Sequence, residues 1–211
     1  TLPMKQRMEI SGGVIGDVDE GAPHVYVKIN TDEGVTGWGE ARPSPRWSYE
    51  TPETVTSTIK HYFIPVLIGQ DVNDLQVIHQ KVDQHIPSGV NPGQPIAKAA
   101  IDMAVHDCIA KAQGKNIVQL WQKNPSPTIK LSFIISPKSP EEAEQKMEEA
   151  IAGGFEGIDL KVGINKGKDK EILKVVSEKA KHMFIRVDAN QAYTFSEALQ
   201  LSKYMENLSV D

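Results

Sequence analysis

The hydrophobic and polar positions follow two different patterns along the chain, and the change comes near residue 125. In the first part, β-branched and aromatic residues on both sides of Asp32-Glu33-Gly34 predict a β-hairpin over 24–40. The loop over 41–48 is rich in proline and has no period, whereas Thr51-Pro52 is typical of a helix start. Helices are therefore predicted from 51, from 72 or 73, and over 97–109.

The helix over 97–109 has the clearest pattern. Its apolar residues recur every three or four positions, which is the spacing of one helix face. Many of them are small: Ala97, Ala100, Ala104 and Cys108 lie on this face. We therefore expect this helix to pack closely against another element.

Beyond residue 128, strand and helix patterns alternate. Strands are predicted over 129–136, 157–162 and 183–189, and helices over 140–152, 168–180 and 196–208. Such alternation predicts parallel βαβ units with right-handed crossovers. The polar, proline-rich segment 124–128 between the two patterns is the best linker candidate. We therefore expect an α+β domain over 1–123 and an α/β domain over 129–211.

Composition narrows the class of protein. The chain has 211 residues, a formal net charge of −5 and one cysteine, Cys108. A lone cysteine excludes an internal disulfide framework and favours a reducing, cytoplasmic location. The net negative charge disfavours nucleic acid as a partner. No apolar stretch approaches the roughly 18 residues of a membrane-spanning helix, so no membrane anchor is expected.

Candidate chemistry lies at the ends of two predicted strands. Residues two apart in a strand share a face, so Asp159 projects with Lys161, and Asp188 with Asn190. The carboxyl ends of parallel strands form the edge at which ligands bind. On these residues alone an alternative stays open: Lys161 is solvated, and Asp188 and Asn190 only open a turn.

Four separated segments carry a resemblance to a known family. They are Gly34–Ala41, Ala97–Asp107 with its continuation to Trp121, Leu160–Gly163 and Arg186–Gln191. In order and spacing they resemble the enolase superfamily, specifically its mandelate racemase and muconate lactonizing enzyme branch. The resemblance implies an enolase-like capping domain followed by the first three βα units of a (β/α)8-type barrel.

The resemblance also implies a chemistry. Mg²⁺, with Mn²⁺ as the alternative ion, would be bound by Asp188 and would stabilise the enediolate formed when a proton leaves the carbon next to a carboxylate. Lys161 matches the acid/base of the second barrel strand, and Asn190 matches a polar residue beside the metal and substrate. The expected partner is a small carboxylate substrate, and the protein is expected to form a homo-oligomer.

The loop before the first helix is similar to the family's substrate-covering loop. It contains Arg46 and Trp47 and is followed by Tyr49. The arginine suits an anionic group of a substrate, and the aromatic residues suit an apolar or cationic one. We expect these three residues to contact substrate; the alternative is that they are solvated loop residues.

Two features depart from the family pattern. Many relatives carry Lys-x-Lys on the second barrel strand, whereas this chain has Asp159 before Lys161. A neighbouring carboxylate would favour the charged form of the lysine and oppose its use as a base, unless Asp159 is satisfied elsewhere. In addition, a closed barrel takes about 250 residues, so five βα units, the other metal ligands and the opposing acid/base would lie beyond residue 211.

These departures lead to three function hypotheses. The first is a racemase, epimerase or cycloisomerase acting through an enediolate, and the second is a dehydratase of sugar acids or hydroxy acids. The third is a non-catalytic remnant that associates with another chain. A single carboxylate binds Mg²⁺ poorly, so this chain alone is expected to be inactive. A first strand of the capping domain is also expected before Leu2.

Overall fold

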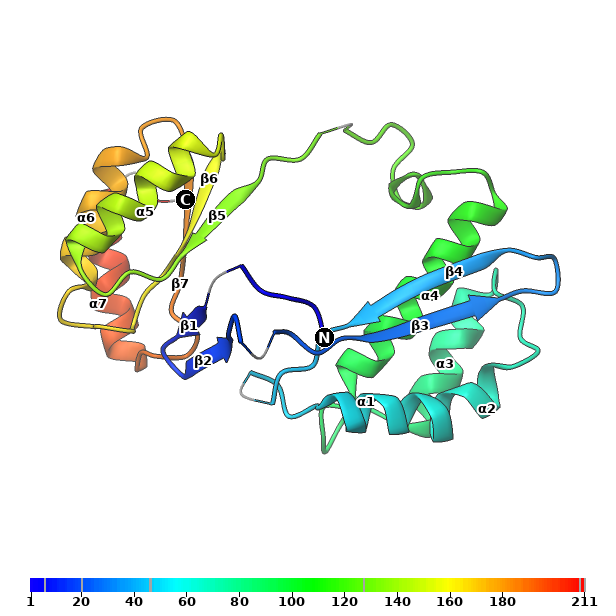
Figure 1. The fold of residues 1–211 in the computed structure, drawn as a ribbon. Coiled ribbons are helices and arrows are strands. Elements are labelled where there is room, and N and C mark those ends of the chain that lie inside the picture. The colour runs from blue at the N-terminus through cyan, green and yellow to red at the C-terminus, as the bar shows by residue number, and fades with distance from the viewer. Residues whose placement is uncertain (6, 20, 46, 127, 209, 211) are drawn as a thin grey trace. The chain divides into compact units, whose positions relative to one another are not determined.

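The computed structural model describes residues 1–211 except 6, 20, 46, 127, 209 and 211. The chain forms two compact units (Figure 1). The first comprises residues 1–5 and 18–126, and the second comprises residues 6–17 and 127–211. The division at 126/127 falls within the segment that the sequence indicates as a linker.

The first unit is built on an antiparallel hairpin. Strand β3 (Val25–Asn30) pairs with β4 (Thr36–Ala41) in the register that joins Val25 to Ala41 and Asn30 to Thr36. The hairpin prediction is therefore confirmed. The helical segments of this unit are α1 (Pro52–Thr58), a π-helical turn (Ile59–Phe63), α2 (Ile64–Leu67), α3 (Leu75–His85), α4 (Pro95–Ala112) and a 3₁₀ turn (Ile117–Leu120).

Helix α4 packs directly on the backbone of β4. A Cβ atom at Gly37 would lie 2.2 Å from the carbonyl oxygen of Ala104, and one at Gly39 would lie 1.9 Å from that of Ala100. Such distances leave no room for a side chain on either strand residue. The close packing predicted from the small residues of this helix is confirmed, and the strand contributes to it with glycines of its own.

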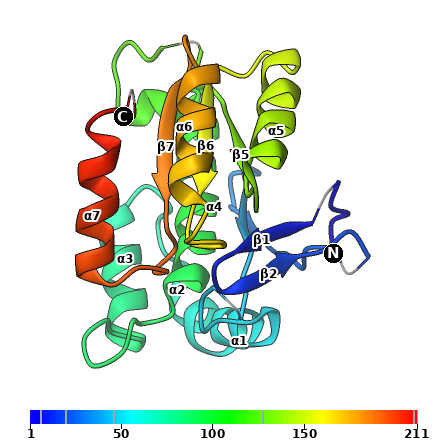
Figure 2. The same ribbon diagram turned by 90° about the vertical axis from the view of Figure 1, so that its left-hand side faces the viewer.

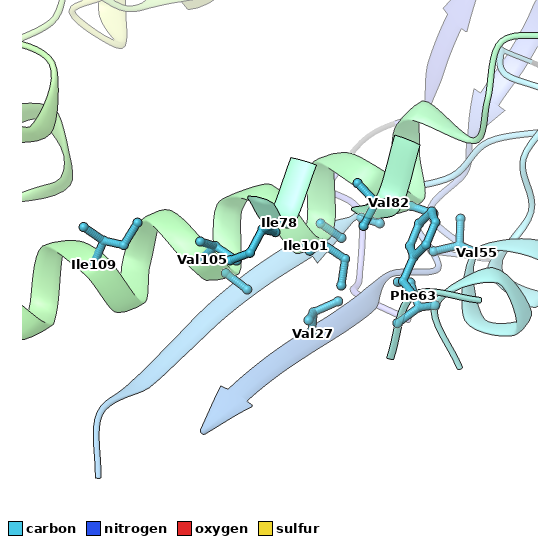
Figure 3. Close-up of a cluster of buried hydrophobic side chains, with 13 residues drawn as sticks. Val27, Val55, Phe63, Ile78, Val82, Ile101, Val105 and Ile109 are labelled. Carbon is cyan, nitrogen blue, oxygen red and sulfur yellow. The ribbon is translucent and has the colours of Figure 1, made fainter. Parts of the chain in front are cut away.

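The apolar core of the first unit lies where β3, α1, α3 and α4 meet (Figure 3). Phe63 is fully buried and lies among branched aliphatic side chains from all of these elements. The labelled members of this core are Val27, Val55, Phe63, Ile78, Val82, Ile101, Val105 and Ile109. Burial of side chains of this size contributes about 1.5–3 kcal/mol each to stability.

Side chains outside the helices satisfy the free amides at helix starts. Thr51 and Thr54 form a capping box at α1, as the sequence indicates. Glu50 does the same for α4, because its carboxylate accepts the amides of Ile96 at 2.7 Å and Ala97 at 3.0 Å. Its side chain is fully buried. This long-range cap connects the end of the loop before α1 to the start of α4.

The second unit contains a three-stranded parallel sheet in the order β5-β6-β7. The strands are β5 (Ser132–Ile135), β6 (Gly157–Lys161) and β7 (Phe184–Asp188). Helices α5 (Pro140–Ala152), α6 (Asp169–Lys179) and α7 (Phe195–Met205) lie on one face of it (Figures 1 and 2). Every predicted strand and helix of this part is present, with bounds shifted by a few residues.

A second hairpin belongs to this unit. Strands β1 (Met8–Ile10) and β2 (Gly13–Gly16) pair with each other, and residues 6–17 cluster with the sheet rather than with the first unit. The Ser11 hydroxyl donates to the carbonyls of Ala189 at 3.4 Å and Asn190 at 3.3 Å. The structure thus differs from the sequence-based expectation that all of 1–123 forms one domain, because these contacts attach the hairpin to the end of β7.

None of the helices in the described part of the chain combines the length and the apolar character that crossing a membrane requires.

Candidate functional site

The candidate site lies at the carboxyl ends of β6 and β7. The register of this parallel pair places Lys161 beside Asp188. Two residues earlier on each strand, and on the same face, it places Asp159 beside Arg186. Side chains of successive layers on one face stack along the strands. Lys161 and Asp188 therefore form the outermost polar layer, at the edge where parallel sheets bind ligands.

Lys161 and Asp188 are in direct contact. The Lys161 Nζ donates to Asp188 Oδ2 at 2.5 Å. The two ends of this ion pair differ in exposure, since the lysine side chain is 8% exposed and the aspartate 47%. The pair thus combines a buried amine with a carboxylate that is open to a ligand.

Asn190 completes the surroundings of Asp188. Its backbone amide donates to Asp188 Oδ1 at 2.8 Å, and its Nδ2 donates to Oδ2 at 3.1 Å. Burial raises the pKa of Asp188, but the hydrogen bonds from Lys161 and Asn190 outweigh it and leave the pKa below its ordinary value. The carboxylate is therefore ionised at neutral pH.

The backbone at Asn190 is strained. Asn190 and Gln191 have φ values of 43° and 65°, which side-chain-bearing residues rarely adopt. The Asn190 Oδ1 atom is buried and accepts no hydrogen bond from the described residues. An unpaired acceptor next to a carboxylate is a polar group available to a ligand.

Asp159 is satisfied away from Lys161. Its two carboxylate oxygens accept from Arg186 Nε at 2.8 Å and Nη2 at 2.9 Å, and Ser132 Oγ donates to Oδ2 at 3.0 Å. A bidentate arginine pair neutralises the carboxylate and fixes its orientation. The substitution of aspartate for the usual first lysine is thus accompanied by a partner on the next strand.

Asp188 has the chemistry of a Mg²⁺ ligand, because it is an ionised, half-exposed carboxylate with hard oxygen donors. The described residues contain no group of three histidine, cysteine, aspartate or glutamate side chains that could hold a metal ion. Asp188 therefore fits as one ligand of a divalent cation, and the described part of the chain supplies no complete set.

The other predicted site residues lie in the first unit or outside the described residues. Trp47 and Tyr49 have exposed side chains, and the Tyr49 hydroxyl accepts the amide of Gln94 at 3.1 Å. Arg46 is not among the residues that the structure describes. The structure brings together Lys161, Asp188 and Asn190, whereas a role of the loop residues in substrate binding remains a prediction.

Three residues close to this site are not predicted from the sequence. Ser11 contacts the end of β7 from the β1–β2 hairpin, as described above. Asp169 and Tyr193 bond to each other behind the strand ends. In the sequence, Asp169 follows a lysine-rich segment and resembles an ordinary acidic residue in the first turn of a helix. Tyr193 lies 24 residues later, and this separation does not indicate that the two side chains are in contact.

Glu197 gives a testable pH dependence near this site. Its carboxylate accepts from the Thr194 amide at 2.8 Å and from Lys166, and these bonds lower its pKa to about 2. A carboxyl group whose pKa is lower in the folded than in the unfolded protein stabilises the fold at any pH above the ordinary glutamate pKa. This stabilisation is lost as the pH falls through the folded-state pKa. Glu197→Gln should therefore lower the melting temperature at pH 7, with a difference from wild type that narrows between pH 4.5 and 2.

Thermal unfolding followed by far-ultraviolet circular dichroism would measure this dependence. Glu178→Gln is the matched control, since Glu178 is exposed and lies 3.9 Å from its partner Lys174. It should change the melting temperature little at any pH. An equal loss for Glu197→Gln at pH 7 and pH 2.5 would contradict the prediction.

Comparison with known proteins places this geometry in a family. Residues 12–121 match the mandelate racemase / muconate lactonizing enzyme N-terminal domain. The N-succinyl-L-Arg/Lys racemase of Bacillus cereus is 31% identical over 212 residues, which cover 100% of this chain and 55% of the racemase. The crystal structure of that enzyme superposes on this chain with a TM-score of 0.85.

Two further solved structures are similar to this chain. A dipeptide epimerase from Enterococcus faecalis, complexed with Mg and the dipeptide L-Leu-L-Tyr, is 27% identical with a TM-score of 0.86, and the match covers 99% of this chain and 56% of the epimerase. A muconate lactonizing enzyme complexed with muconolactone is 25% identical with a TM-score of 0.83, over 99% of this chain and 55% of that protein.

The chain spans about half the length of the relatives it matches. Within that span it contains a capping domain and part of a parallel β/α region. On the match over residues 12–121 and on these similarities, the chain belongs to the mandelate racemase / muconate lactonizing enzyme family of the enolase superfamily.

Proposed function

We propose that the protein containing this chain is a Mg²⁺-dependent isomerase, a racemase, epimerase or cycloisomerase that removes the proton next to a substrate carboxylate. The observation that supports this most directly is the contact between Lys161 Nζ and Asp188 Oδ2 at the ends of adjacent parallel strands. It combines an amine that can transfer a proton with a carboxylate that can bind a cation.

Lys161 would transfer the proton. Its side chain is nearly buried, so the amine is held in one place with little access to bulk water. Fixed position is a large part of the advantage of an enzymatic base over a base in solution. Asn190, whose Oδ1 accepts no hydrogen bond from the described residues, would orient a donor group of the substrate.

Asp188 would hold the cation. When bound, Mg²⁺ would stabilise the negative charge that develops on the substrate carboxylate. The hydrogen bonds from Asn190 fix the orientation of the Asp188 carboxylate, and orientation of this kind strengthens metal binding. The remaining ligands would come from outside the described residues.

The substrate class that we propose is an N-acyl amino acid or a dipeptide. The relatives with 27–31% identity include an N-succinyl-L-Arg/Lys racemase and epimerases that act on dipeptides. In this chain, the side chains of Trp47 and Tyr49 are exposed, and aromatic faces suit an apolar or cationic substrate side chain.

Exchange of the substrate α-proton in deuterated water tests this proposal. The protein expressed from the complete coding sequence should incorporate deuterium into at least one member of a panel of N-succinyl amino acids and dipeptides. Removal of Mg²⁺ with EDTA should lower the rate about 100-fold, because the charge on the carboxylate is then unstabilised. Added Mg²⁺ should restore it.

Circular dichroism with and without EDTA is the control, and we expect no change in folded content. Exchange that is insensitive to EDTA, or absent from every member of the panel in the presence of Mg²⁺, would contradict the proposal. Loss of water from sugar acids or hydroxy acids in the same assay would favour a dehydratase instead.

A further inference from the structure

A buried carboxylate connects the two loops that follow the catalytic strand ends. Asp169, at the start of α6, is 2% exposed. Its Oδ2 atom accepts the backbone amide of Gly163 at 2.8 Å and the hydroxyl of Tyr193. Gly163 comes two residues after Lys161, and Tyr193 comes five residues after Asp188. One oxygen atom therefore bonds to both loops.

The two loops also touch each other directly. Gly163 has a φ of +84°, and a Cβ atom on it would lie 2.2 Å from the Cβ of Ala192. Only glycine fits there, for reasons of backbone conformation and of space. The loop after β6 thus packs against the loop after β7 at the point where Asp169 bonds to both.

Lys166 adds a third connection on the outside. Its ammonium group lies 4.9 Å from the centre of the Tyr193 ring and donates to Glu197 at 3.0 Å. Tyr193 is therefore held at two points: its hydroxyl bonds to the buried Asp169, and its ring contacts the Lys166 ammonium group. Burial, together with the hydrogen bond to Asp169, raises the pKa of the Tyr193 hydroxyl, so it remains a donor over the whole accessible range of pH.

We propose that Gly163, Asp169 and Tyr193 form a clamp that holds Lys161 and Asp188 at their working separation. Asp169 and Tyr193 are positioning residues in this proposal, since they act through the loops and not on the substrate. The inference rests on the proposed function for its catalytic consequence. The clamp itself is a property of the loops and is tested separately.

The physical reason is that the two reactive groups lie on different strands. Lys161 and Asp188 are the last residues of β6 and β7 and lie opposite each other in the strand register, where the Val162 amide donates to the Asp188 carbonyl at 3.1 Å. Beyond this bond the two loops are held to each other by the contacts of Asp169. A displacement of about 1 Å at reacting groups lowers rates by as much as 100-fold. A buried, charge-assisted link between the loops limits such displacement, because hydrogen bonds to a carboxylate are short and strong.

Hydrogen–deuterium exchange of the backbone tests the clamp. In Tyr193→Phe, amides over 162–168 and 189–194 should exchange about tenfold faster, because one hydrogen bond to a buried carboxylate is lost. Tyr204→Phe is the matched control: its hydroxyl donates to the Lys170 carbonyl at 3.2 Å and also connects α7 to α6, but it bonds to neither of the two loops. It should leave both loops unchanged.

The same variants test positioning in the deuterium wash-in assay, at a temperature where circular dichroism shows all of them folded. Tyr193→Phe should lower kcat about tenfold and leave KM within twofold, while Tyr204→Phe should change neither. A residue that only stabilises the fold would lower the melting temperature and leave kcat of the folded protein unchanged.

Substitution of Asp169 provides a graded series. Asp169→Asn keeps a carbonyl oxygen that can accept from both Gly163 and Tyr193, whereas Asp169→Ala removes the acceptor. We expect the asparagine variant to retain most of the loop protection and activity and the alanine variant to lose both. Equal effects of the two variants would overturn the proposal.

The outcomes separate the clamp from the proposed function. Loop exchange in Tyr193→Phe at the wild-type rate would overturn the clamp and leave the isomerase proposal standing. A wild-type protein with no α-proton exchange would refute the isomerase proposal, and the loop measurements would still decide whether the clamp exists. Faster loop exchange with an unchanged kcat would overturn the positioning role.

Discussion

Replacing Lys161 with alanine is expected to lower the rate of α-proton exchange by about 10³-fold, within the range of 10² to 10⁴ typical of a lost general acid/base. The amine is the only proton-transfer group that the described residues place in contact with Asp188. Its removal leaves the carboxylate available to a cation but no group positioned to accept the proton. We therefore expect kcat to fall.

The control for this prediction is Lys174→Ala. Lys174 lies on α6 in the same unit, with an exposed side chain and a partner 3.9 Å away. Both substitutions remove one positive charge, so a general electrostatic effect would appear in both. Exchange by Lys161→Ala within tenfold of the wild-type rate would show that another group is the base.

Much of the site could be predicted from short-range rules. Residues two apart in a strand share a face, and parallel strands end at a common edge, so Lys161 and Asp188 were expected at the same place. The structure confirms their proximity, with 2.5 Å between Nζ and Oδ2. The resemblance to the family supplied their roles, which spacing alone left open.

The surroundings of Asp159 could not be predicted in this way. The sequence shows an acidic residue two positions before Lys161 but not which residue opposes it on the next strand. That depends on the register between β6 and β7, which pairs Asp159 with Arg186. The ion pair satisfies both oxygens of the Asp159 carboxylate away from Lys161, since both are bonded to Arg186.

The fold shows the same division between local and long-range information. Helix caps such as Thr51 lie next to the element they serve and were predicted. Glu50 caps a helix more than forty residues later, and the β1–β2 hairpin packs on the end of β7, so neither carries a local signal. Contacts of this kind depend on the tertiary structure and not on propensity.

The largest effect on stability is expected from Gly39→Ala in the first unit. The added methyl group would lie 1.9 Å from the Ala100 carbonyl oxygen and 2.8 Å from the Ala104 amide nitrogen. These are backbone atoms of α4, so no side chain can rotate away, and the whole helix must shift from β4. Overpacking commonly costs about 1–3 kcal/mol, and we expect a loss near 3 kcal/mol because the obstacle is backbone.

Denaturant unfolding followed by tryptophan fluorescence would measure this loss in the right unit. All three tryptophans, Trp38, Trp47 and Trp121, lie in the first unit, so their signal reports its unfolding and not that of the β/α unit. Gly89→Ala is the matched control, since a Cβ atom there meets nothing within 4 Å. If both variants unfolded at the same denaturant concentration, helix α4 would not lie as close to β4 as the structure places it.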